Sequence, residues 1–253
     1  MRLYCFPHAG ATSSVYRPWK ALETPRLQIC GVDQPGRGTR IREPNIDDFR
    51  ALVESMTEHV VADLLQAREQ VPHLGYATFG HSFGSMLSLS VAAAVARAVG
   101  QSPLRAILSA ALPPRLQPFD ETASLTDAEL LDKIVADGGT PPELLADKAM
   151  ARYLVRPLRE DYAIRRQFPQ ESSLRVDFPL TLVAAREDEH VPSERMWKWS
   201  EHSSAPCRRV EIPGGHFAPV QEPGEILAIV SEDISRSDRA TAVGTSETLA
   251  ARR

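Results

Sequence analysis

The sequence predicts an α/β domain with a mostly parallel sheet, helices on both faces of that sheet and an inserted helical segment. Short apolar runs alternate with longer runs in which apolar residues recur at helical spacing. Several of the short runs are apolar at consecutive positions, which is typical of strands buried on both faces of a parallel sheet. A chain of 253 residues is long enough to bury one substantial core. Together these observations predict one domain that carries an insertion.

Six short runs are expected to form strands, and two longer runs are expected to form the helices between them. The strand candidates are bounded by turn residues and are, in chain order, RLYCF, LQICGVD, LGYATF, LRAILSAA, FPLTLVAA and CRRVEI. The segment from Asp47 to Leu65 has apolar residues at helical spacing, and the alanine-rich run after Ser82 predicts another helix. Both are interpreted as crossover helices of a parallel sheet.

The alternation stops between Pro113 and Phe178, an interval far longer than an ordinary connection. Helical patterns fill this interval, so we interpret residues 113–178 as a helical lid. The lid would be inserted into an α/β core formed by residues 1–112 and 179–234. The last residues, 235–253, are small and polar without apolar periodicity, and they predict a disordered tail.

Two helices are expected inside the predicted lid. Thr126 and Glu129 have the spacing of a capping box at the start of the first helix, and Gly138 is a stop signal at its end. The second helical pattern follows and is interrupted at Pro157.

Composition argues against several classes of function. The formal net charge is −4 and no lysine-rich block occurs, so we expect no nucleic-acid partner. The three cysteines are an odd number without C-x-x-C spacing, which is typical of free thiols in a reducing compartment. The first residues, MRLYCFPHAG, are too short an apolar run for a signal peptide or a membrane span. We therefore expect a cytoplasmic protein without a membrane partner. We also expect a monomer.

The segment FGHSFG places Ser82 between Gly80 and Gly84, after a predicted strand and before a predicted helix. In this context G-x-S-x-G is the nucleophile elbow, a tight turn that lifts the serine hydroxyl onto the sheet edge. Bulky side chains at either glycine would clash in such a turn. The motif therefore predicts Ser82 as a catalytic nucleophile, and an ordinary Gly-Ser turn is the alternative.

A serine hydroxyl needs a base to accept its proton, and the base needs an acid to orient it. In this type of fold the acid and the histidine follow the serine in that order. His216, in the glycine-hinged loop IPGGHFAPV after the last strand candidate, is the predicted base, with His190 and His202 as alternatives. His81 belongs to the elbow, and its ring is expected to pack under the turn.

Three acidic residues follow the strand FPLTLVAA and could orient the base. Asp188 is the predicted acid, although Glu187, Asp188 and Glu189 could instead form a solvated acidic turn. Asp33 is a weaker candidate because it precedes the serine in the chain.

An oxyanion hole requires two N–H donors that converge on a developing negative charge. We assign them to the backbone amides of Phe83, directly after the nucleophile, and Ala9, in the loop CFPHAGAT. His8 lies in this loop, but no second ligand sits at metal-binding spacing, so neither a metal nor another cofactor is expected.

Taken together, these motifs resemble the type II thioesterases that accompany nonribosomal peptide and polyketide synthases. The resemblance rests on CFPHAG, DQPGRGTR, GHSFG, LTDAELLDKIVADGGTPPELL, RPLREDY, REDEHV and PGGHF, and it spans the chain from Leu3 to about Ile234. Ala11 stands where the family usually has the second glycine of PHAGG. Relatives also tend to carry residues ahead of the first strand, so either the sheet lacks an edge strand or the true start lies upstream.

The resemblance implies an α/β-hydrolase fold with a helical lid. It also implies a serine hydrolase that removes acyl groups from phosphopantetheine-bearing carrier proteins, either to edit misprimed or stalled chains or to release product. Ser82, Asp188 and His216 fall where the family keeps its triad. A general carboxylesterase or acyl-CoA thioesterase is the nearer alternative, and a non-catalytic hydrolase-fold binding module is the other.

Substrate contacts are expected on the predicted lid and beside it. The candidates for an acyl pocket, which could equally form the core of the lid, are Leu131, Met150, Tyr153 and Leu158. Carrier proteins of this kind are generally acidic, so arginines could form a docking rim. The candidates for that rim are Arg37, Arg40, Arg152, Arg156, Arg165 and Arg166.

Overall fold

The computed structural model describes residues 1–117, 124–138 and 148–250, the side chains of residues 137, 148–152 and 237–250 excepted. Its centre is one sheet of six strands in the order β2-β1-β3-β4-β5-β6, and every neighbouring pair is parallel. The strands are β1 (Arg2–Phe6), β2 (Gln28–Gly31), β3 (Tyr76–His81), β4 (Ala106–Ser109), β5 (Leu180–Ala185) and β6 (Cys207–Ile212). All six predicted strands and the parallel sheet are confirmed.

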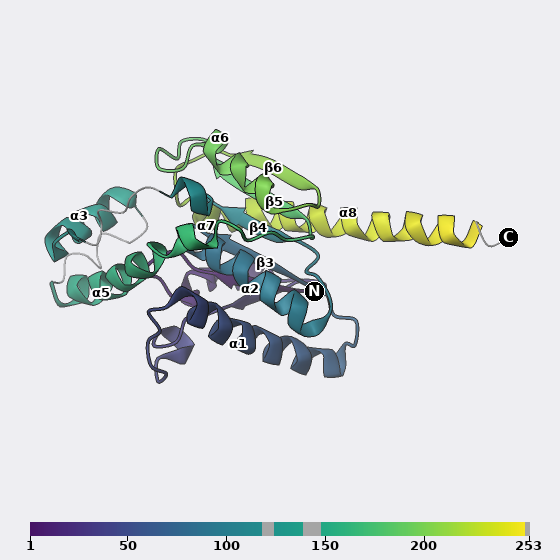
Figure 1. Ribbon diagram of the computed structural model, residues 1–253, viewed down its shortest axis with the longest axis horizontal. Coiled ribbons are helices and arrows are strands. Elements are labelled where there is room, and N and C mark those ends of the chain that lie inside the picture. The colour runs from purple at the N-terminus through teal and green to yellow at the C-terminus, as the bar shows by residue number, and fades with distance from the viewer. Residues whose placement is uncertain (118–123, 139–147, 251–253) are drawn as a thin grey trace.

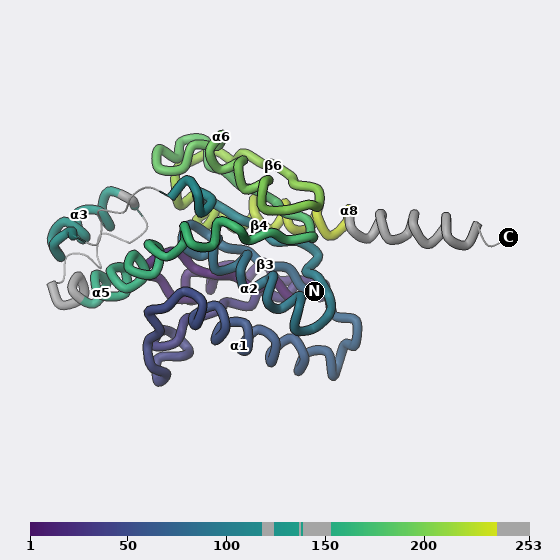
Figure 2. Tube along the Cα trace, viewed as in Figure 1, coloured from purple at the N-terminus to yellow at the C-terminus, as the bar shows by residue number. Residues whose placement is uncertain are grey.

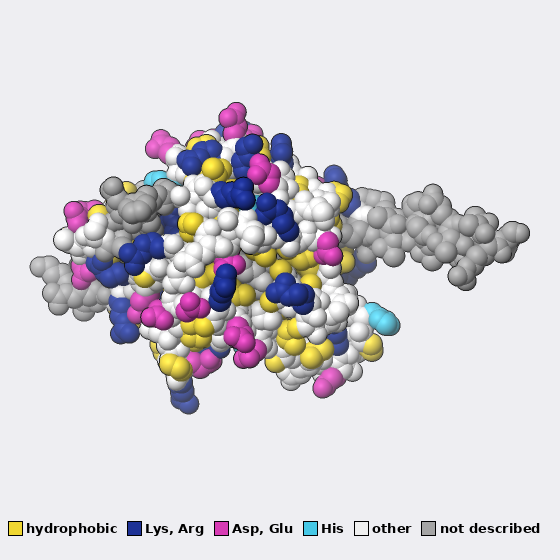
Figure 3. Space-filling model, in the orientation of Figure 1, with side chains coloured by type: hydrophobic (Ala, Val, Ile, Leu, Met, Phe, Trp, Pro, Cys, Tyr) yellow, Lys and Arg dark blue, Asp and Glu magenta, His cyan; other side chains and the backbone are white. Residues whose placement is uncertain are grey.

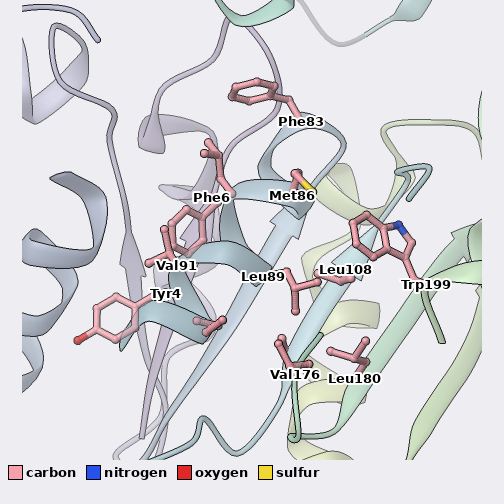
Figure 4. Packing of buried hydrophobic residues seen from close by; sticks show 14 of the residues in the cluster. Tyr4, Phe6, Phe83, Met86, Leu89, Val91, Leu108, Val176, Leu180 and Trp199 are labelled. Carbon is pink, nitrogen blue, oxygen red and sulfur yellow. The ribbon is translucent and has the colours of Figure 1, made fainter. Parts of the chain in front are cut away.

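Alternate residues of each strand enter two separate apolar cores, one on each face of the sheet. Tyr4 and Phe6 of β1 belong to the first core, which contains the inner sides of α1 (Phe49–Gln70) and α2 (Phe83–Val99). Figure 4 shows part of this cluster, including Phe6, Met86 and Leu89. Helices α1 and α2 lie side by side over this face (Figure 1, Figure 2). The two predicted crossover helices are therefore confirmed.

The opposite face of the sheet is covered by short helical turns and by the last helix. Leu3 and Cys5 of β1 point to this side and share a core with Trp19 and Ile226. The covering elements are η1 (Ser13–Tyr16), η2 (Pro18–Leu22), α7 (Ala218–Gln221) and α8 (Pro223–Ala250). Helices on both faces cover the apolar side chains that these strands carry on both sides. This arrangement places the carboxyl ends of all six strands at one edge.

Between β4 and β5 the described chain is helical, as the sequence predicts for residues 113–178. The elements there are η4 (Pro114–Leu116), α3 (Asp127–Asp137), α5 (Lys148–Arg165) and η6 (Phe168–Glu171). Helices α3 and α5 extend from one side of the sheet domain (Figure 1). They enclose a small apolar core of their own, made by Leu130, Val155, Leu158 and Tyr162. The described part of this segment is thus helical, whereas its role as a lid stays a prediction.

Helix α3 begins and ends where the sequence predicts. The Thr126 side chain accepts from the Glu129 N–H and the Glu129 carboxylate accepts from the Thr126 N–H, which is the predicted capping box. Gly138 follows in the left-handed conformation with φ of 72°. The interruption expected at Pro157 does not occur, because α5 continues through it. Packing of Val155 and Leu158 against Leu130 compensates for the hydrogen bond that the proline ring removes.

The C-terminal helix differs from the expectation of a disordered tail over residues 235–253. The backbone of α8 is helical through Ala250, and no proline follows Pro223 to interrupt it. Among the described residues, no helix combines the length and the apolar character that a membrane span requires.

Candidate active site

Ser82 lies at the turn between β3 and α2 and has an unusual backbone conformation. Its φ is 53° and its ψ is −119°, a region that costs a residue with a side chain about 1–3 kcal/mol. Surrounding hydrogen bonds hold the turn in place. The Ser82 N–H donates to the Ser109 carbonyl at 2.8 Å, and the Ser85 hydroxyl lies 2.8 Å from the carbonyl oxygens of both Gly80 and Ser109, to either of which it can donate. Strain that is maintained in this way is typical of a functional site.

The two glycines of the motif are required by backbone contacts. A Cβ at Gly80 would lie 2.2 Å from the Gly84 carbonyl oxygen, and a Cβ at Gly84 would lie 2.1 Å from the Phe6 carbonyl oxygen. Backbone atoms cannot yield at such distances, so the predicted clash at both positions is confirmed. The Gly84 contact also presses the start of α2 against the loop that follows β1.

Asp188 and His216 form a hydrogen-bonded pair at the same sheet edge. Asp188 follows β5 and His216 follows β6, and His216 Nδ1 lies 2.8 Å from Asp188 Oδ2. The other carboxylate oxygen, Oδ1, accepts the N–H groups of His190 at 2.9 Å and Val191 at 3.0 Å. This pattern fixes the carboxylate and leaves Nε2 of the imidazole as the nitrogen that can accept a proton.

The hydrogen bonds of Asp188 outweigh the cost of its burial. Burial raises the pKa of Asp188, but the hydrogen bond and charge of His216 and the two backbone N–H groups lower it further, so the pKa lies below its ordinary value. The carboxylate therefore stays ionised opposite the imidazole.

The imidazole of His216 is held beside the elbow by ring contacts. Its centroid lies 5.2 Å from that of His81, the residue before Ser82, and 5.1 Å from that of Phe217. Within the described part of the chain no hydrogen bond joins the Ser82 hydroxyl to His216. Catalytic hydrogen bonds are often long before a substrate is bound. The three predicted triad residues are thus brought to one sheet edge.

The alternatives to His216 have other surroundings. His202 is buried, its Nδ1 lies 2.8 Å from the Leu174 carbonyl oxygen, and its ring lies against Trp199. His190 is exposed, and its ring meets the edge of His216 at 5.7 Å between centroids. Among the residues that the structure describes, the His202 ring nitrogen lies beside a backbone carbonyl, whereas that of His216 lies beside a buried carboxylate.

The alternative acids also have other partners. The Glu187 carboxylate accepts the Gly214 N–H, and Glu189 is exposed. Asp33 is buried and accepts hydrogen bonds from the backbone and side chains of Ser13 and Thr39, so it joins two loops. Asp188 remains the acid that contacts a histidine at the elbow.

The two predicted oxyanion donors belong to the two segments that meet at Gly84, which are the start of α2 and the loop after β1. Phe83 is the first residue of α2, where an N–H group has no acceptor within the helix. Ala9 lies in the loop after β1, and its N–H donates to no acceptor among the residues that the structure describes. Gly10 follows with φ of 76°, and the Ala11 N–H closes a turn to the His8 carbonyl at 3.2 Å. Phe83 directly follows Ser82, and Ala9 lies in the loop whose first residues meet Gly84, so both N–H groups stay candidates for the oxyanion hole.

Two further histidines lie close to His216, of which His81 is fully buried and His8 is half-buried with its Nδ1 out of contact with water. His81 is fully buried and its Nδ1 lies 3.3 Å from the Ser109 hydroxyl. His8 packs edge-on against Phe217 at 4.9 Å and against His81 at 5.9 Å between centroids. Burial, with a smaller contribution from His216, lowers the pKa of His8 to about 4 and that of His81 well below its ordinary value. Both rings are therefore neutral at pH 7.

These shifts predict that acid destabilises the fold through His8 and His81. Between the unfolded value of 6.5 and the folded value of about 4 for His8, the unfolded chain binds a proton that the native state excludes. The free energy of unfolding should therefore fall as the pH drops through this window, by up to about 1.4 kcal/mol per pH unit for each histidine. Denaturant titrations of His8→Gln should give a flatter pH dependence than wild type. His59→Gln, at an exposed position of α1, serves as control; equal slopes for His8→Gln and wild type would contradict the assignment.

The predicted pocket residues divide between the core and the surface of the helical segment. Leu158 is buried with Leu130 and Tyr162, and Leu131 packs against the same cluster, which favours the alternative that they form the lid core. Tyr153 is 69% exposed. The side chain of Met150 lies outside the described residues.

Two arginines of the predicted docking rim are not at the surface. The Arg37 side chain is only 8% exposed and forms an ion pair with Asp161 at 2.6 Å. The Arg40 side chain is 10% exposed and is bound to Glu43 and Ser55. The rim prediction is wrong for Arg37, because its charge faces a buried carboxylate instead of solvent. No local sequence signal marks Asp161 as the partner of Arg37, although RPLREDY and DQPGRGTR are among the motifs behind the resemblance.

The remaining rim candidates have mixed surroundings. Arg156 is exposed and pairs with Glu160, whereas Arg165 is half-buried and bonds to Gln117. Arg166 is exposed. The side chain of Arg152 lies outside the described residues.

Comparison with known families decides the classification. The model of the thioesterase domain matches residues 1–234. The chain belongs to the thioesterase family. The protein is accordingly a hydrolase that acts on thioesters, with the α/β-hydrolase fold of that family.

Individual relatives agree with this classification. Thioesterase PikA5 of Streptomyces venezuelae is 29% identical over 234 residues, which cover 92% of this chain and 81% of that protein. The structure of the RedJ thioesterase from the prodiginine biosynthetic pathway of Streptomyces coelicolor superposes with a TM-score of 0.78 at 28% identity. It covers 92% of this chain and 90% of that one.

One relative of this thioesterase has a name from another reaction class. The protein named linear gramicidin dehydrogenase LgrE, of Brevibacillus parabrevis, is 27% identical over 238 residues, 92% of this chain and 87% of that protein. A dehydrogenase of the dinucleotide-binding class would carry a G-x-G-x-x-G fingerprint after a strand. The present sequence contains no such fingerprint.

Proposed function

We propose that this thioesterase hydrolyses acyl groups from the phosphopantetheine arm of carrier proteins in a polyketide or nonribosomal peptide pathway. The observation that carries the proposal is the His216–Asp188 pair beside the strained Ser82 elbow, on a chain of the thioesterase family. The names of PikA5 and RedJ support the pathway class. Editing of stalled chains and release of product are both compatible with this chemistry.

The proposed reaction has two halves that use the same residues. In the first, the Ser82 hydroxyl attacks the thioester carbonyl while His216 Nε2 takes its proton, and the tetrahedral oxyanion is bound by the N–H groups of Ala9 and Phe83. The carbon–sulfur bond then breaks, and His216 returns the proton to the leaving thiolate. In the second, water attacks the acyl-serine ester with His216 again as base, which releases a carboxylic acid and the serine.

Asp188 serves both halves of the proposed reaction. Its carboxylate holds the N–H of His216 at Nδ1 and stabilises the imidazolium that forms each time Nε2 takes a proton. The neutral rings of His8 and His81 add no positive charge beside that imidazolium. The site therefore suits repeated proton transfer by one histidine.

If a carrier protein delivers the substrate, kcat/KM should depend on the salt concentration. The value of kcat/KM for an acyl-carrier protein should exceed that for the matching acyl-N-acetylcysteamine and should fall as ionic strength rises, because screening weakens steering between charged surfaces. The small thioester should respond little to salt. Steady-state kinetics of both substrates from low to high salt measure this difference.

A double variant tests which surface of the protein contacts the carrier protein. Arg156→Gln with Arg166→Gln removes two exposed charges, one on α5 and one directly after its last residue, and it should lower kcat/KM for the carrier protein roughly 3- to 10-fold at low salt. Arg97→Gln, an exposed change at the far end of α2, is the control. On the face seen in Figure 3, basic and acidic side chains are interspersed, so a local effect is expected, not one of net charge. Equal rates and equal salt responses for both substrates would instead favour a general esterase.

A further inference from the structure

A buried carboxylate of helix α5 reaches the loop that carries the proposed oxyanion donor. Asp161 is fully buried, and its Oδ2 accepts the Gly10 N–H at 2.7 Å and Arg37 Nη1 at 2.6 Å. Its Oδ1 accepts from the Gln34 side-chain amide at 3.2 Å. The three donors come from the loops after β1 and β2. One side chain of the inserted segment thus joins both loops of the sheet edge.

Arg37, which lies in the loop after β2, makes further contacts between that loop and α5. Its Nη2 donates to the Pro157 carbonyl at 3.1 Å and to the Glu160 carboxylate at 3.3 Å, both on α5. Burial raises the pKa of Asp161, whereas Arg37 and the hydrogen bonds of Gly10 and Gln34 act against that rise. Removing one member of such a buried pair leaves the other uncompensated, which is strongly unfavourable. The contacts of Asp161 and Arg37 therefore favour one position of α5 on the two loops.

The contacts converge on Gly10, the residue next to the proposed donor. A Cβ at Gly10 would lie 3.3 Å from the Leu158 Cβ, and Leu158 is three residues before Asp161 on α5. Leu158 therefore occupies the space beside Gly10, and Asp161 on the same helix holds the Gly10 N–H. Fixing the Gly10 N–H fixes the peptide plane between Ala9 and Gly10. The orientation of the Ala9 N–H, one peptide earlier, depends on that plane.

We propose that Asp161 is a positioning residue for the oxyanion hole, which holds the Ala9 amide in place through Gly10 from its position on the inserted helix. The inference rests on the proposed function, in which the Ala9 N–H binds the oxyanion. Because the carboxylate belongs to the insertion, the geometry of the hole is complete only while α5 is seated on the two loops.

The test is Asp161→Asn, measured with a small acyl thioester so that carrier docking does not contribute. Asparagine removes the negative charge that faces Arg37 and leaves one acceptor oxygen for three donors, so the Gly10 N–H loses its charge-assisted hydrogen bond. We expect kcat to fall roughly 10- to 100-fold with KM within about 3-fold of wild type, since an oxyanion interaction acts in the transition state. Kinetic constants are expressed per native molecule, with the native fraction taken from circular dichroism.

A second readout separates positioning from a general loss of structure. A trifluoromethyl ketone forms a bond from the Ser82 oxygen to its carbonyl carbon, and the resulting oxyanion occupies the hole. Its affinity should fall in Asp161→Asn in step with kcat/KM, whereas the affinity for the product carboxylate should not change. Asp161→Glu keeps a charge for Arg37 but shifts the oxygens relative to Gly10, and the same signature is expected at smaller size.

The control is Glu171→Gln, which removes the exposed ion pair with Arg50 between α1 and η6 and leaves Gly10 untouched. It should leave both readouts unchanged. The proposal is overturned if folded Asp161→Asn or Asp161→Glu keeps wild-type kcat and ketone affinity, or changes KM alone. Failure of the proposed function would look different, since Ser82→Ala would then retain turnover whatever Asp161 does.

Discussion

Ser82→Ala abolishes thioester turnover and leaves the protein folded: this is the largest effect that we expect from a single substitution. The hydroxyl is the group that forms the acyl-enzyme, so its removal should lower kcat by about 10⁴-fold or more. Alanine keeps a Cβ at φ of 53°, so the strain of the elbow is unchanged and only the hydroxyl is lost. Single-turnover kinetics with an acyl-N-acetylcysteamine measure the rate. Intact-protein mass spectrometry should detect an acyl adduct on wild type and none on the variant.

A matched control for Ser82→Ala lies on the same helix. Ser90 is a buried residue of α2 whose hydroxyl has no hydrogen-bond partner among the described residues. Ser90→Ala should therefore retain wild-type turnover and form the acyl adduct. Near wild-type turnover by folded Ser82→Ala would reject the nucleophile assignment.

Asp188→Asn should lower turnover by about 10⁴-fold because it places the proton of His216 on the wrong nitrogen. The position of Oδ1 accepts two backbone N–H groups, from His190 and Val191, so the amide oxygen of an asparagine would be held there. Its NH₂ group would then face His216 Nδ1, which must accept a hydrogen bond. The imidazole would carry its proton on Nε2 and could not take the proton of Ser82. The loss should appear in kcat, and trapping of the acyl-enzyme should slow to the same degree.

The neighbouring acids are the comparison for Asp188. Glu189 is exposed, so Glu189→Gln should be neutral, whereas Glu187→Gln should have a small effect through the Gly214 N–H of the histidine loop. If either of these proved as damaging as Asp188→Asn is expected to be, the acid would be misplaced. Thermal unfolding of all three variants checks that the loops remain intact.

The α/β architecture could be predicted from local patterns because each strand has its own recognisable run of apolar residues. A strand such as LTLVAA is apolar at successive positions and therefore needs cover on both faces, which only helices on either side of a parallel sheet supply. The elbow was equally readable, since Gly80 and Gly84 are demanded by backbone atoms within a few residues or across one strand. The start of α3 depends on Thr126 and Glu129 alone.

Other features depended on residues far away in the chain. Arg37 is typical of a solvated arginine in its local sequence, yet its partner Asp161 lies 124 residues later and buries it. Pro157 predicts a break in isolation, but the helix continues because its apolar face packs against α3. The divisions into core, lid and tail, like the roles of the triad, stay predictions until the variants are measured.

The residue types, the order serine, acid and histidine, and the strand–turn–helix context of Ser82 follow from the sequence, because steric and hydrophobic demands act over short stretches of chain. Which of Glu187, Asp188 and Glu189 faces His216, and whether an arginine faces water or a carboxylate, is decided by tertiary packing. A charged side chain takes its role from the group opposite it and from the water that packing removes. For Asp188 and Asp161 those groups are brought near only by the folding of loops from separate strands.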